Sequence, residues 1–150
     1  MNVSYEWSNL GSVLAGFNRI ERGLESLKPL WGEFQEQFQK DERDLFAAAP
    51  WPPLSERYAE QKRRQFGNKP LLRATDALFE SLTEAGAEGS VRRIDDLQAE
   101  FGTSVEYAPF HQLGTSRMPA RPPLIEPEEK TYSTIAGRYM ESLIESAGFN

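Results

Sequence analysis

LGSVLAGFNRIERGLESLKPLWGEFQEQF, residues 10–38, is the stretch that decides the fold. Its apolar residues recur at alternating intervals of three and four, which is the spacing of one face of an α-helix. The members of this apolar stripe are Leu10, Val13, Phe17, Ile20, Leu24, Leu27, Trp31, Phe34 and Phe38. The pattern therefore predicts a long N-terminal helical region with one continuous apolar face.

Pro29 lies inside the stripe. A proline in a helix removes a hydrogen bond and costs ~3 kcal/mol, so we expect a kink or a break there, with Pro29 opening a second helix. A continuous helix from Leu10 to Leu45 would be roughly 54 Å long, whereas a domain of this size is about 40 Å wide. The helical region, residues 1–49, therefore either bends at Pro29 or projects from the domain.

Two interpretations of the stripe remain open. It is either a core face within the chain or a surface for self-association, because a projecting apolar face needs a partner chain to cover it. The candidate self-association residues are Val13, Phe17, Ile20, Leu24, Leu27, Trp31, Phe34 and Phe38.

Two further helices are predicted after a proline-rich connector at residues 47–54 (AAAPWPPL). Its prolines stop the first region because they cannot continue a helix. Ser55 is a good N-terminal cap for a helix that runs to about Phe66. The next helix is expected over about Leu71–Glu84, where leucines recur on one face.

The second half of the chain predicts a small sheet, a loop and a last helix. From Val91 to Tyr107, apolar and polar residues alternate, which indicates a small antiparallel meander. Residues 113–127 contain four prolines and are expected to form a loop. Helical spacing returns from Glu128 to Ala147, and Gly148 is a suitable C-terminal cap. The expected fold class is α+β.

Composition predicts one globular domain, residues 1–150, since 39% of the chain is apolar and 11% is aromatic. The chain has no cysteine, which excludes disulfides, cysteine-bound zinc and thiol nucleophiles and is typical of a protein made in a reducing cytosol. No window approaches the ~18 apolar residues of a membrane span, so no membrane partner is expected.

The chain is acidic, with a net charge of −6. Residues 1–75 hold 11 Lys and Arg against 10 Asp and Glu, a net +1, whereas residues 76–150 hold 6 against 13, a net −7. Such a chain is a poor duplex binder, because affinity for DNA comes mainly from neutralising phosphates. The basic run Lys62-Arg63-Arg64 is expected to be a solvated helix face. The alternative is a nucleic-acid-binding regulator that uses the helix Ser55–Phe66.

Catalytic candidates are few. His111 could act as a base, with Ser104 or Ser116 as the nucleophile and Asp95 or Glu106 as the residue that orients it. No G-x-S-x-G motif accompanies them. We therefore favour the simpler interpretation, in which this single histidine hydrogen-bonds the nearby backbone, and we expect no catalytic residue.

Metal and cofactor sites are not predicted either. Asp95-Asp96 with Glu100 lacks the spaced oxygen ligands of a calcium loop, and turn formation explains the aspartate pair. The segment Gly86–Gly89 has no following lysine and precedes a strand, so it is not a phosphate-binding loop. We expect no metal ligand and no cofactor.

The loop near residue 120 contains several prolines, which restrict its backbone. Pro119, Pro122, Pro123 and Pro127 each restrict φ, so the loop would lose little entropy on docking. Arg121 stands between prolines and is expected to be a pre-positioned cation that binds a partner. The alternative, a rigid linker to the last helix, explains the prolines but not the arginine.

Several short motifs occur in a fixed order along the chain. They are Trp51-Pro-Pro-Leu-Ser55, Lys62, Leu71-Leu-Arg73, Thr75, Leu78, Ser81, Tyr107-Ala108, His111-Gln112, Gly114, Pro119-Ala-Arg-Pro122 and Leu124. Through them, roughly from residue 20 to residue 145, the chain resembles the phage virion morphogenesis family, the tail-completion proteins of Mu-like and related long-tailed phages. It departs from the family pattern at Asp76, where glycine is common, and at Pro123, where phenylalanine is common.

The resemblance implies a structural protein and not an enzyme. Such a part is made in the host bacterial cytoplasm and ends in the virion, at the head-proximal end of the tail or in the neck. It acts as a ring of identical subunits that contacts the tail tube and neck or connector proteins, with DNA only as passing cargo. The residues carried over as an assembly and docking site are Tyr107, His111, Gln112, Gly114, Pro119, Arg121, Pro122 and Leu124. We expect Arg121→Ala to leave the fold intact and to impair assembly.

Overall fold

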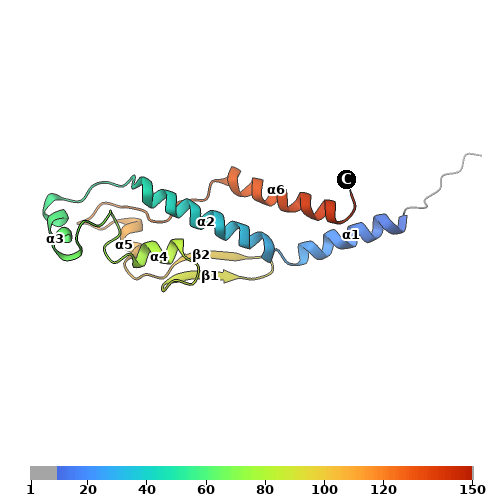
Figure 1. Ribbon diagram of the computed structural model, residues 1–150, viewed down its shortest axis with the longest axis horizontal. Helices are drawn as coiled ribbons and strands as arrows, with labels where there is room; N and C mark the ends of the chain where they lie inside the picture. The colour runs from blue at the N-terminus through green and yellow to red at the C-terminus, as the bar shows by residue number, and fades with distance from the viewer. Residues whose placement is uncertain (1–9, 150) are drawn as a thin grey trace, which may run out of the picture.

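The helix α2 is the central element of the structure. The elements in chain order are α1 Leu10–Glu25, α2 Lys28–Ala48, α3 Glu56–Phe66, α4 Ala77–Thr83, β1 Ser90–Ile94, β2 Ala99–Thr103, α5 Ala108–Leu113 and α6 Glu129–Ser146. In this computed structural model, α6 lies along one side of α2 and the two strands with α4 lie along the other (Figure 1). Residues 10–149 are described, so residues 1–9 of the predicted N-terminal region lie outside them.

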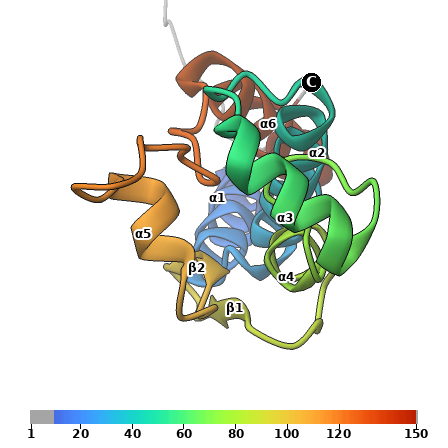
Figure 2. The same ribbon diagram turned by 90° about the vertical axis from the view of Figure 1, so that its left-hand side faces the viewer.

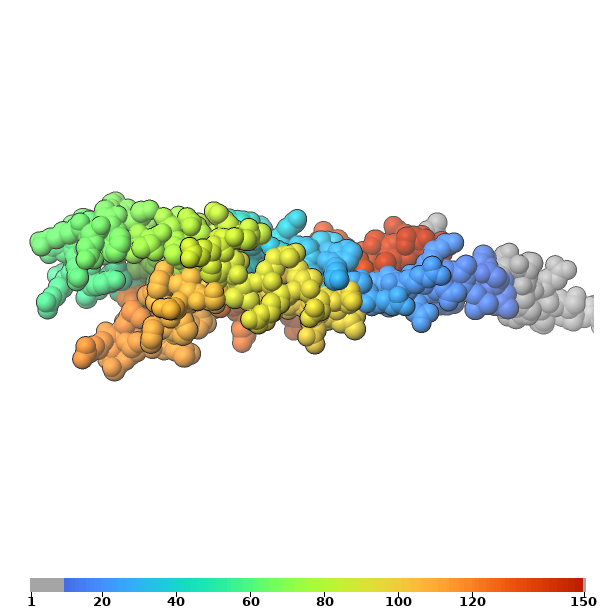
Figure 3. Space-filling view, turned by 90° about the horizontal axis from the view of Figure 1, so that it is seen from below, coloured from blue at the N-terminus to red at the C-terminus, as the bar shows by residue number. Residues whose placement is uncertain are grey.

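The molecule is elongated because α1 continues beyond the rest of the chain. Both α3 and α5 lie at the end of α2 that is remote from α1 (Figures 1 and 2). At the other end, α1 and the C-terminal part of α6 form a narrow extension, which is visible in the space-filling view (Figure 3). Helix length predicted either a bend at Pro29 or a projection from the domain, and α1 projects (Figure 1).

The predicted break in the first helical region is confirmed and falls just before Pro29, which occupies the first turn of α2. Of the two alternatives, a kinked helix or two helices, the chain forms two helices separated by two residues. The turn between the strands fixes this break. The Leu27 N–H donates to the Asp96 carbonyl over 2.7 Å, and the Trp31 indole N–H donates to the Asp95 carbonyl over 3.2 Å.

Two glycines let α1 pack closely on α6. A Cβ placed on Gly23 would lie 2.5 Å from the Leu143 side chain, and one on Gly16 would lie 2.6 Å from the Phe149 ring. The Tyr139 hydroxyl donates to the Gly23 carbonyl over 3.0 Å. Because only a residue without a side chain allows this approach, the glycine side of α1 is the side that α6 covers.

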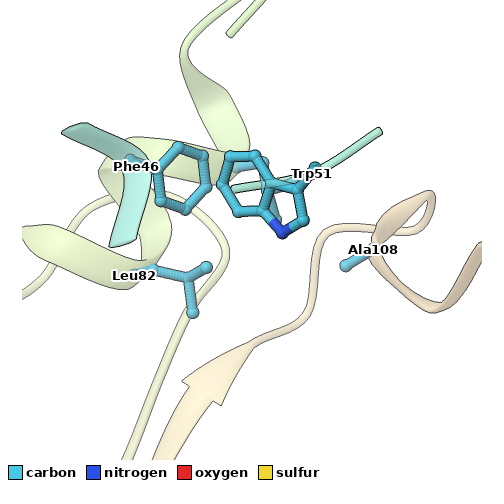
Figure 4. Close-up of a cluster of buried hydrophobic side chains, with 5 residues drawn as sticks. Phe46, Trp51, Leu82 and Ala108 are labelled. Atoms are coloured by element: carbon cyan, nitrogen blue, oxygen red, sulfur yellow. The ribbon is translucent and has the colours of Figure 1, made fainter. Parts of the chain in front are cut away.

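The hydrophobic core lies where α2, α4 and α5 meet. It contains Phe46, Trp51, Leu78, Leu82 and Ala108 (Figure 4). The rings of Phe46 and Trp51 meet edge to face with centroids 5.2 Å apart, a favoured aromatic geometry. The core therefore joins the end of α2 and the proline-rich connector to the later half of the chain.

The helix expected over Leu71–Glu84 is shorter than predicted, since only α4 is helical and residues 71–76 form turns. Leu72 and Asp76 have positive φ angles of 59° and 63°, which an α-helix does not tolerate. The Asp76 carboxylate holds this turn, because it accepts hydrogen bonds from Lys69 and Arg73, each over 2.7 Å. The positive φ angles at Leu72 and Asp76 therefore delay the start of the helix to Ala77, and the two bonds to Asp76 stabilise the turn.

The expected meander is a two-stranded hairpin. Its strands pair antiparallel from Ser90 opposite Thr103 to Ile94 opposite Ala99. The third limb, expected to reach Tyr107, is a turn that leads into α5, a helix not predicted from the sequence. Proline in the first turn of α5 favours this start.

The remaining predictions of secondary structure are confirmed, and with them the α+β class. The Ser55 hydroxyl accepts a hydrogen bond from the Tyr58 N–H and so caps α3. The last helix is α6, and Gly148 follows it with a φ of 88° in the left-handed region that ends helices. None of the helices in residues 10–149 combines the length and apolar character that a membrane crossing requires.

Leu78→Ala tests the placement of the core. The Leu78 side chain is 0% exposed, so its truncation should leave a cavity and lower the free energy of unfolding by about 2–5 kcal/mol. Leu113→Ala is the matched control, because that leucine is 80% exposed and its loss should change stability by no more than about 0.5 kcal/mol. Urea unfolding followed by tryptophan fluorescence measures both, and equal midpoints would contradict this core.

Candidate functional site

Two proline-rich segments distant in sequence are joined by a buried arginine. The Arg121 side chain is only 3% exposed. Its Nε donates to the Pro52 carbonyl over 2.7 Å and its Nη2 donates to the Pro53 carbonyl over 2.8 Å. The Trp51 indole N–H donates in the opposite direction, to the Pro122 carbonyl, over 2.8 Å. We call Trp51, Pro52, Pro53, Arg121 and Pro122 the proline clamp.

The expectation that Arg121 is a free docking cation is therefore wrong. Successive prolines provide carbonyl acceptors but no N–H donors, and a planar guanidinium can reach two neighbouring acceptors at once. Arg121 satisfies the backbone of the connector, and its burial keeps the guanidinium away from a partner. We had expected Arg121→Ala to leave the fold intact. Because the side chain is buried and bonds the connector, this substitution should instead destabilise the fold.

The loop after α5 is held by a side chain that imitates a backbone partner. The Gln112 amide donates to the Leu124 carbonyl over 3.0 Å, and its oxygen accepts from the Leu124 N–H over 3.1 Å. The Arg121 N–H donates to the His111 carbonyl over 2.7 Å. These three bonds tie the segment around residues 121–124 to one side of α5.

Gly114 begins the outer turn of this loop and has a φ of 73°. A Cβ there would lie 2.7 Å from the Ala120 nitrogen, so this position requires glycine. Beyond it, the Thr115 N–H donates to the Met118 carbonyl over 2.8 Å. Pro119 is exposed at the end of this turn. Of the predicted docking residues, Pro119 and Tyr107 are exposed, whereas the others mainly hold the loop.

A cavity of about 360 Å³ lies between α3, the turn before α4 and the loop. Its lining is mostly apolar and aromatic, and it includes Tyr58, Phe66, Tyr107 and His111. Lys62 also lines it and is buried, so the expectation of a solvated basic face is wrong for this residue.

Lys62 is used to satisfy carbonyl groups in the same way as Arg121. Its ammonium donates to the Lys69 carbonyl over 3.1 Å and to the Pro70 carbonyl. Burial lowers the Lys62 pKa, and the charge of Asp76 opposes that shift. Only Arg63 and Arg64 of the basic run remain exposed, and Arg64 is paired with Glu60. The run therefore provides less free positive charge than its sequence indicates.

His111 does not form the expected bond to the backbone through its Nδ1, which is buried without a hydrogen-bond partner among the described residues. Its ring packs edge to face on Tyr107, with centroids 5.8 Å apart. Burial lowers the His111 pKa, and the nearby charge of Arg121 lowers it further, so both effects favour the neutral ring. The cavity that it lines contains none of the four groups considered with it, namely Ser104, Ser116, Asp95 and Glu106.

The apolar stripe is divided between two surfaces by the break before α2. On α1 the exposed apolar residues form what we call the α1 face: Leu10, Val13, Phe17 and Leu24 of the stripe, with Leu14 beside them. On α2 the stripe residues Trp31, Phe34 and Phe38 are half-buried and line an open groove, which we call the aromatic groove. Its other apolar lining residues are Leu97, Phe101, Leu124, Ile125 and Tyr132. Ile20 on α1 and Leu27 in the break between the helices are half-buried.

Glu42 is a buried acid that the sequence analysis did not single out. It follows Phe38 by four residues and precedes Phe46 by four. This spacing places Glu42 on the apolar face of the helix and could have predicted its burial. Its Oε2 has no hydrogen-bond partner among residues 10–149. Burial raises the Glu42 pKa to about 8, against a smaller opposing effect of a hydrogen bond with the Ile125 backbone. At neutral pH this side chain is therefore mostly protonated.

The carboxyls near Glu42 do not form a metal site. No group of three His, Cys, Asp or Glu residues within residues 10–149 is arranged to hold a metal ion. The neighbouring Asp41 instead accepts a hydrogen bond from the Tyr132 hydroxyl over 3.1 Å. This bond joins α2 to α6 and has a structural role.

Comparisons with models of known protein families, with curated proteins and with solved structures found no match. The likeness to tail-completion proteins therefore rests on the ordered residues of the sequence.

Arg121→Ala tests the proline clamp. Two carbonyl groups would lose a charged donor, and each such bond contributes about 1.5–3 kcal/mol, so we expect a loss of about 3 kcal/mol in the free energy of unfolding. Arg117→Ala removes an exposed arginine from the same loop and should change it by about 0.5 kcal/mol or less. Chemical denaturation compares the two, and a clamp variant as stable as the control would contradict the role assigned to Arg121.

Glu42→Gln tests the buried acid. The unfolded chain releases the Glu42 proton above its ordinary pKa of 4.5, whereas the folded chain keeps it up to about pH 8. Wild-type stability should therefore fall across this window, by about 1.4 kcal/mol per pH unit. The variant lacks this loss, so its advantage should be smallest near pH 4 and largest above pH 8. Urea unfolding at each pH measures it, with exposed Glu36→Gln as the control. Parallel pH profiles of Glu42→Gln and wild type would show that Glu42 is not protonated in the fold.

Proposed function

We propose that this protein is a structural part of a long-tailed phage virion, which completes the tail or joins it to the head as an oligomeric ring. The observation that carries the proposal is that the family-like motifs act together. Trp51-Pro-Pro and Pro119-Ala-Arg-Pro122 lie far apart in the sequence, yet the Arg121 bond to Pro52 spans 69 residues and unites them in one clamp. Two of the motifs that carry the resemblance therefore belong to one structural unit.

A departure from the family pattern also fits the proposal. Asp76 occupies a position where the family commonly has glycine, and its φ of 63° lies in the region that favours glycine. Aspartate is among the few other residues that adopt this conformation readily. The backbone that the family pattern requires is therefore kept despite the different residue.

The proposal requires self-association, and the α1 face supports it. Contiguous apolar patches on an exposed helix are typical of interaction surfaces. The residues of this face lie beside the side that α6 covers and stay 36–58% exposed, so they contribute little to the stability of a single chain. A ring also needs two unlike surfaces on each subunit, and the chain has a second apolar surface in the aromatic groove.

The charge of the chain fits a passage for DNA. A net charge of −6 opposes binding of phosphates, so DNA would move past such a ring without being retained. The burial of Lys62 removes part of the basic run that would favour the nucleic-acid-binding alternative.

Assembly of the purified chain tests the proposed function. We expect oligomers by light scattering, rings by electron microscopy, and occupancy of the ends of tails that lack a completion protein. Leu14→Glu should reduce assembly at least tenfold, because it places a charge within the exposed α1 face. Arg22→Gln is the control, since it makes the same change of charge on another exposed side of α1.

A chain that stays monomeric at every concentration and never joins tails would refute the proposal. Equal assembly by the two variants would show that α1 is not an interface. Circular dichroism and unfolding midpoints confirm that each variant is folded, which separates a loss of assembly from a loss of structure.

A further inference from the structure

The exposed residues of the α1 face form one narrow stripe. At 3.6 residues per turn, Leu10, Val13, Leu14, Phe17 and Leu24 fall within an arc of about 100°. The glycines that contact α6 lie on a neighbouring side of the helix, so α6 does not cover this arc. Phe17 touches the Phe149 ring at one edge, with centroids 5.2 Å apart, but it remains 58% exposed.

The aromatic groove is the complementary surface. Trp31, Phe34 and Phe38 of α2 line it on one side, and residues 97–101 and residues 124–132 line the rest. It is open and encloses about 830 Å³. Leu97 and Ile125 are among these lining residues and are exposed. Its lining is dominated by apolar side chains, which indicates that another apolar element covers it.

The helix α1 of the same chain cannot fill this groove. Only two residues separate α1 from α2, and α1 continues away from the body where the groove lies (Figure 1). The packing of α6 on Gly16 and Gly23 holds α1 in that direction. Among residues 10–149, no other segment of the chain fills either apolar surface, and Leu14 and Leu97 stay exposed.

We propose that the first two turns of α1 from one copy of this chain occupy the aromatic groove of the next copy. Leu10, Leu14 and Phe17 have the i, i+4, i+7 spacing with which an amphipathic helix enters an apolar groove. The segment Leu10–Asn18 contains no charged residue, which suits an apolar interior. A charge first appears on this helix at Arg19, so docking of two turns buries no ionised group from α1.

This contact is head-to-tail. The surface given by one copy differs from the surface used on its neighbour, so each added copy presents a new free groove or a new free helix. An alternative contact, in which two α1 faces pair with each other, would stop at a dimer. The inference rests on the self-association in the proposed function, but it does not require a phage partner.

Cysteine cross-linking tests the contact, because the natural chain has no cysteine. Leu14→Cys places a thiol on the α1 face, and Leu97→Cys places one on the wall of the groove. Under mild oxidation, a mixture of the two variants should give disulfide-linked dimers. Each variant alone should give at least tenfold fewer. A mixture of Leu14→Cys with Leu113→Cys, which is exposed outside the groove, is the background control.

Complementation of two defective variants gives a second test that does not depend on thiols. Leu14→Glu blocks the helix but keeps the groove, whereas Leu97→Glu blocks the groove but keeps the helix. Each alone should be monomeric by light scattering, and their mixture should form dimers of one copy each that grow no further. No other arrangement of these two surfaces gives that stoichiometry.

Cross-linking of Leu14→Cys with itself, together with normal assembly of Leu97→Glu, would replace the head-to-tail contact by a pairing of α1 faces. The absence of both cross-links would overturn the inference and leave the groove for a different occupant. If the predicted cross-link and complementation are observed but the oligomer never joins tails, the proposed function fails while this contact stands.

Discussion

The hydrogen bond from the Leu27 N–H to the Asp96 carbonyl determines how the rest of the chain is arranged. Pro29 prevents a regular helix from passing through this point, and the turn of the hairpin supplies an acceptor for the amide that the break leaves free. The apolar stripe is continuous in sequence, but this single interruption assigns its first half to an exposed helix and its second half to a groove. The unlike surfaces of the molecule result from one local interruption.

A second constraint is the lack of backbone donors in the proline-rich segments. Pro52 and Pro53 offer two carbonyl acceptors close to the core, and a buried carbonyl without a partner is costly. Arg121 meets both with one planar group, and Lys62 serves the Lys69 and Pro70 carbonyls in the same way. The basic residues that looked most suited to a partner are therefore used inside the chain.

Local patterns were sufficient for most of the fold but not for these burials. Periodicity located α1, α2 and α6, and the cap at Ser55 located α3. The shortening of α4 follows from the positive φ angles of Leu72 and Asp76, which the leucine periodicity of residues 71–84 does not express. The burial of Arg121 could not be predicted because its acceptors are 68 and 69 residues away.

The residues predicted as a docking site lie close together in the fold, but their docking role stays a prediction. The motif residues around Gln112 and Arg121 do form one unit, as their ordered occurrence indicated, but most of them hold the loop and do not face outward. Glu42 was overlooked because an acidic residue is normally assigned to a solvated face. Glu42 lies on the same face of α2 as Phe38 and Phe46 and is buried with them. Protonation removes its charge and so lowers the free-energy cost of that burial.

In the proposed assembly, the angle between α1 and α2 sets the rotation from one copy to the next. A head-to-tail contact closes into a ring only if that rotation divides a full turn, and otherwise it produces a helical filament. Two features hold the angle: the hairpin turn at the break and the close packing of α6 on Gly16 and Gly23. The glycines thus matter twice, because they leave the apolar face of α1 uncovered and fix the direction in which that face is presented. The same local bonds that end one helix would then determine the curvature of the whole assembly.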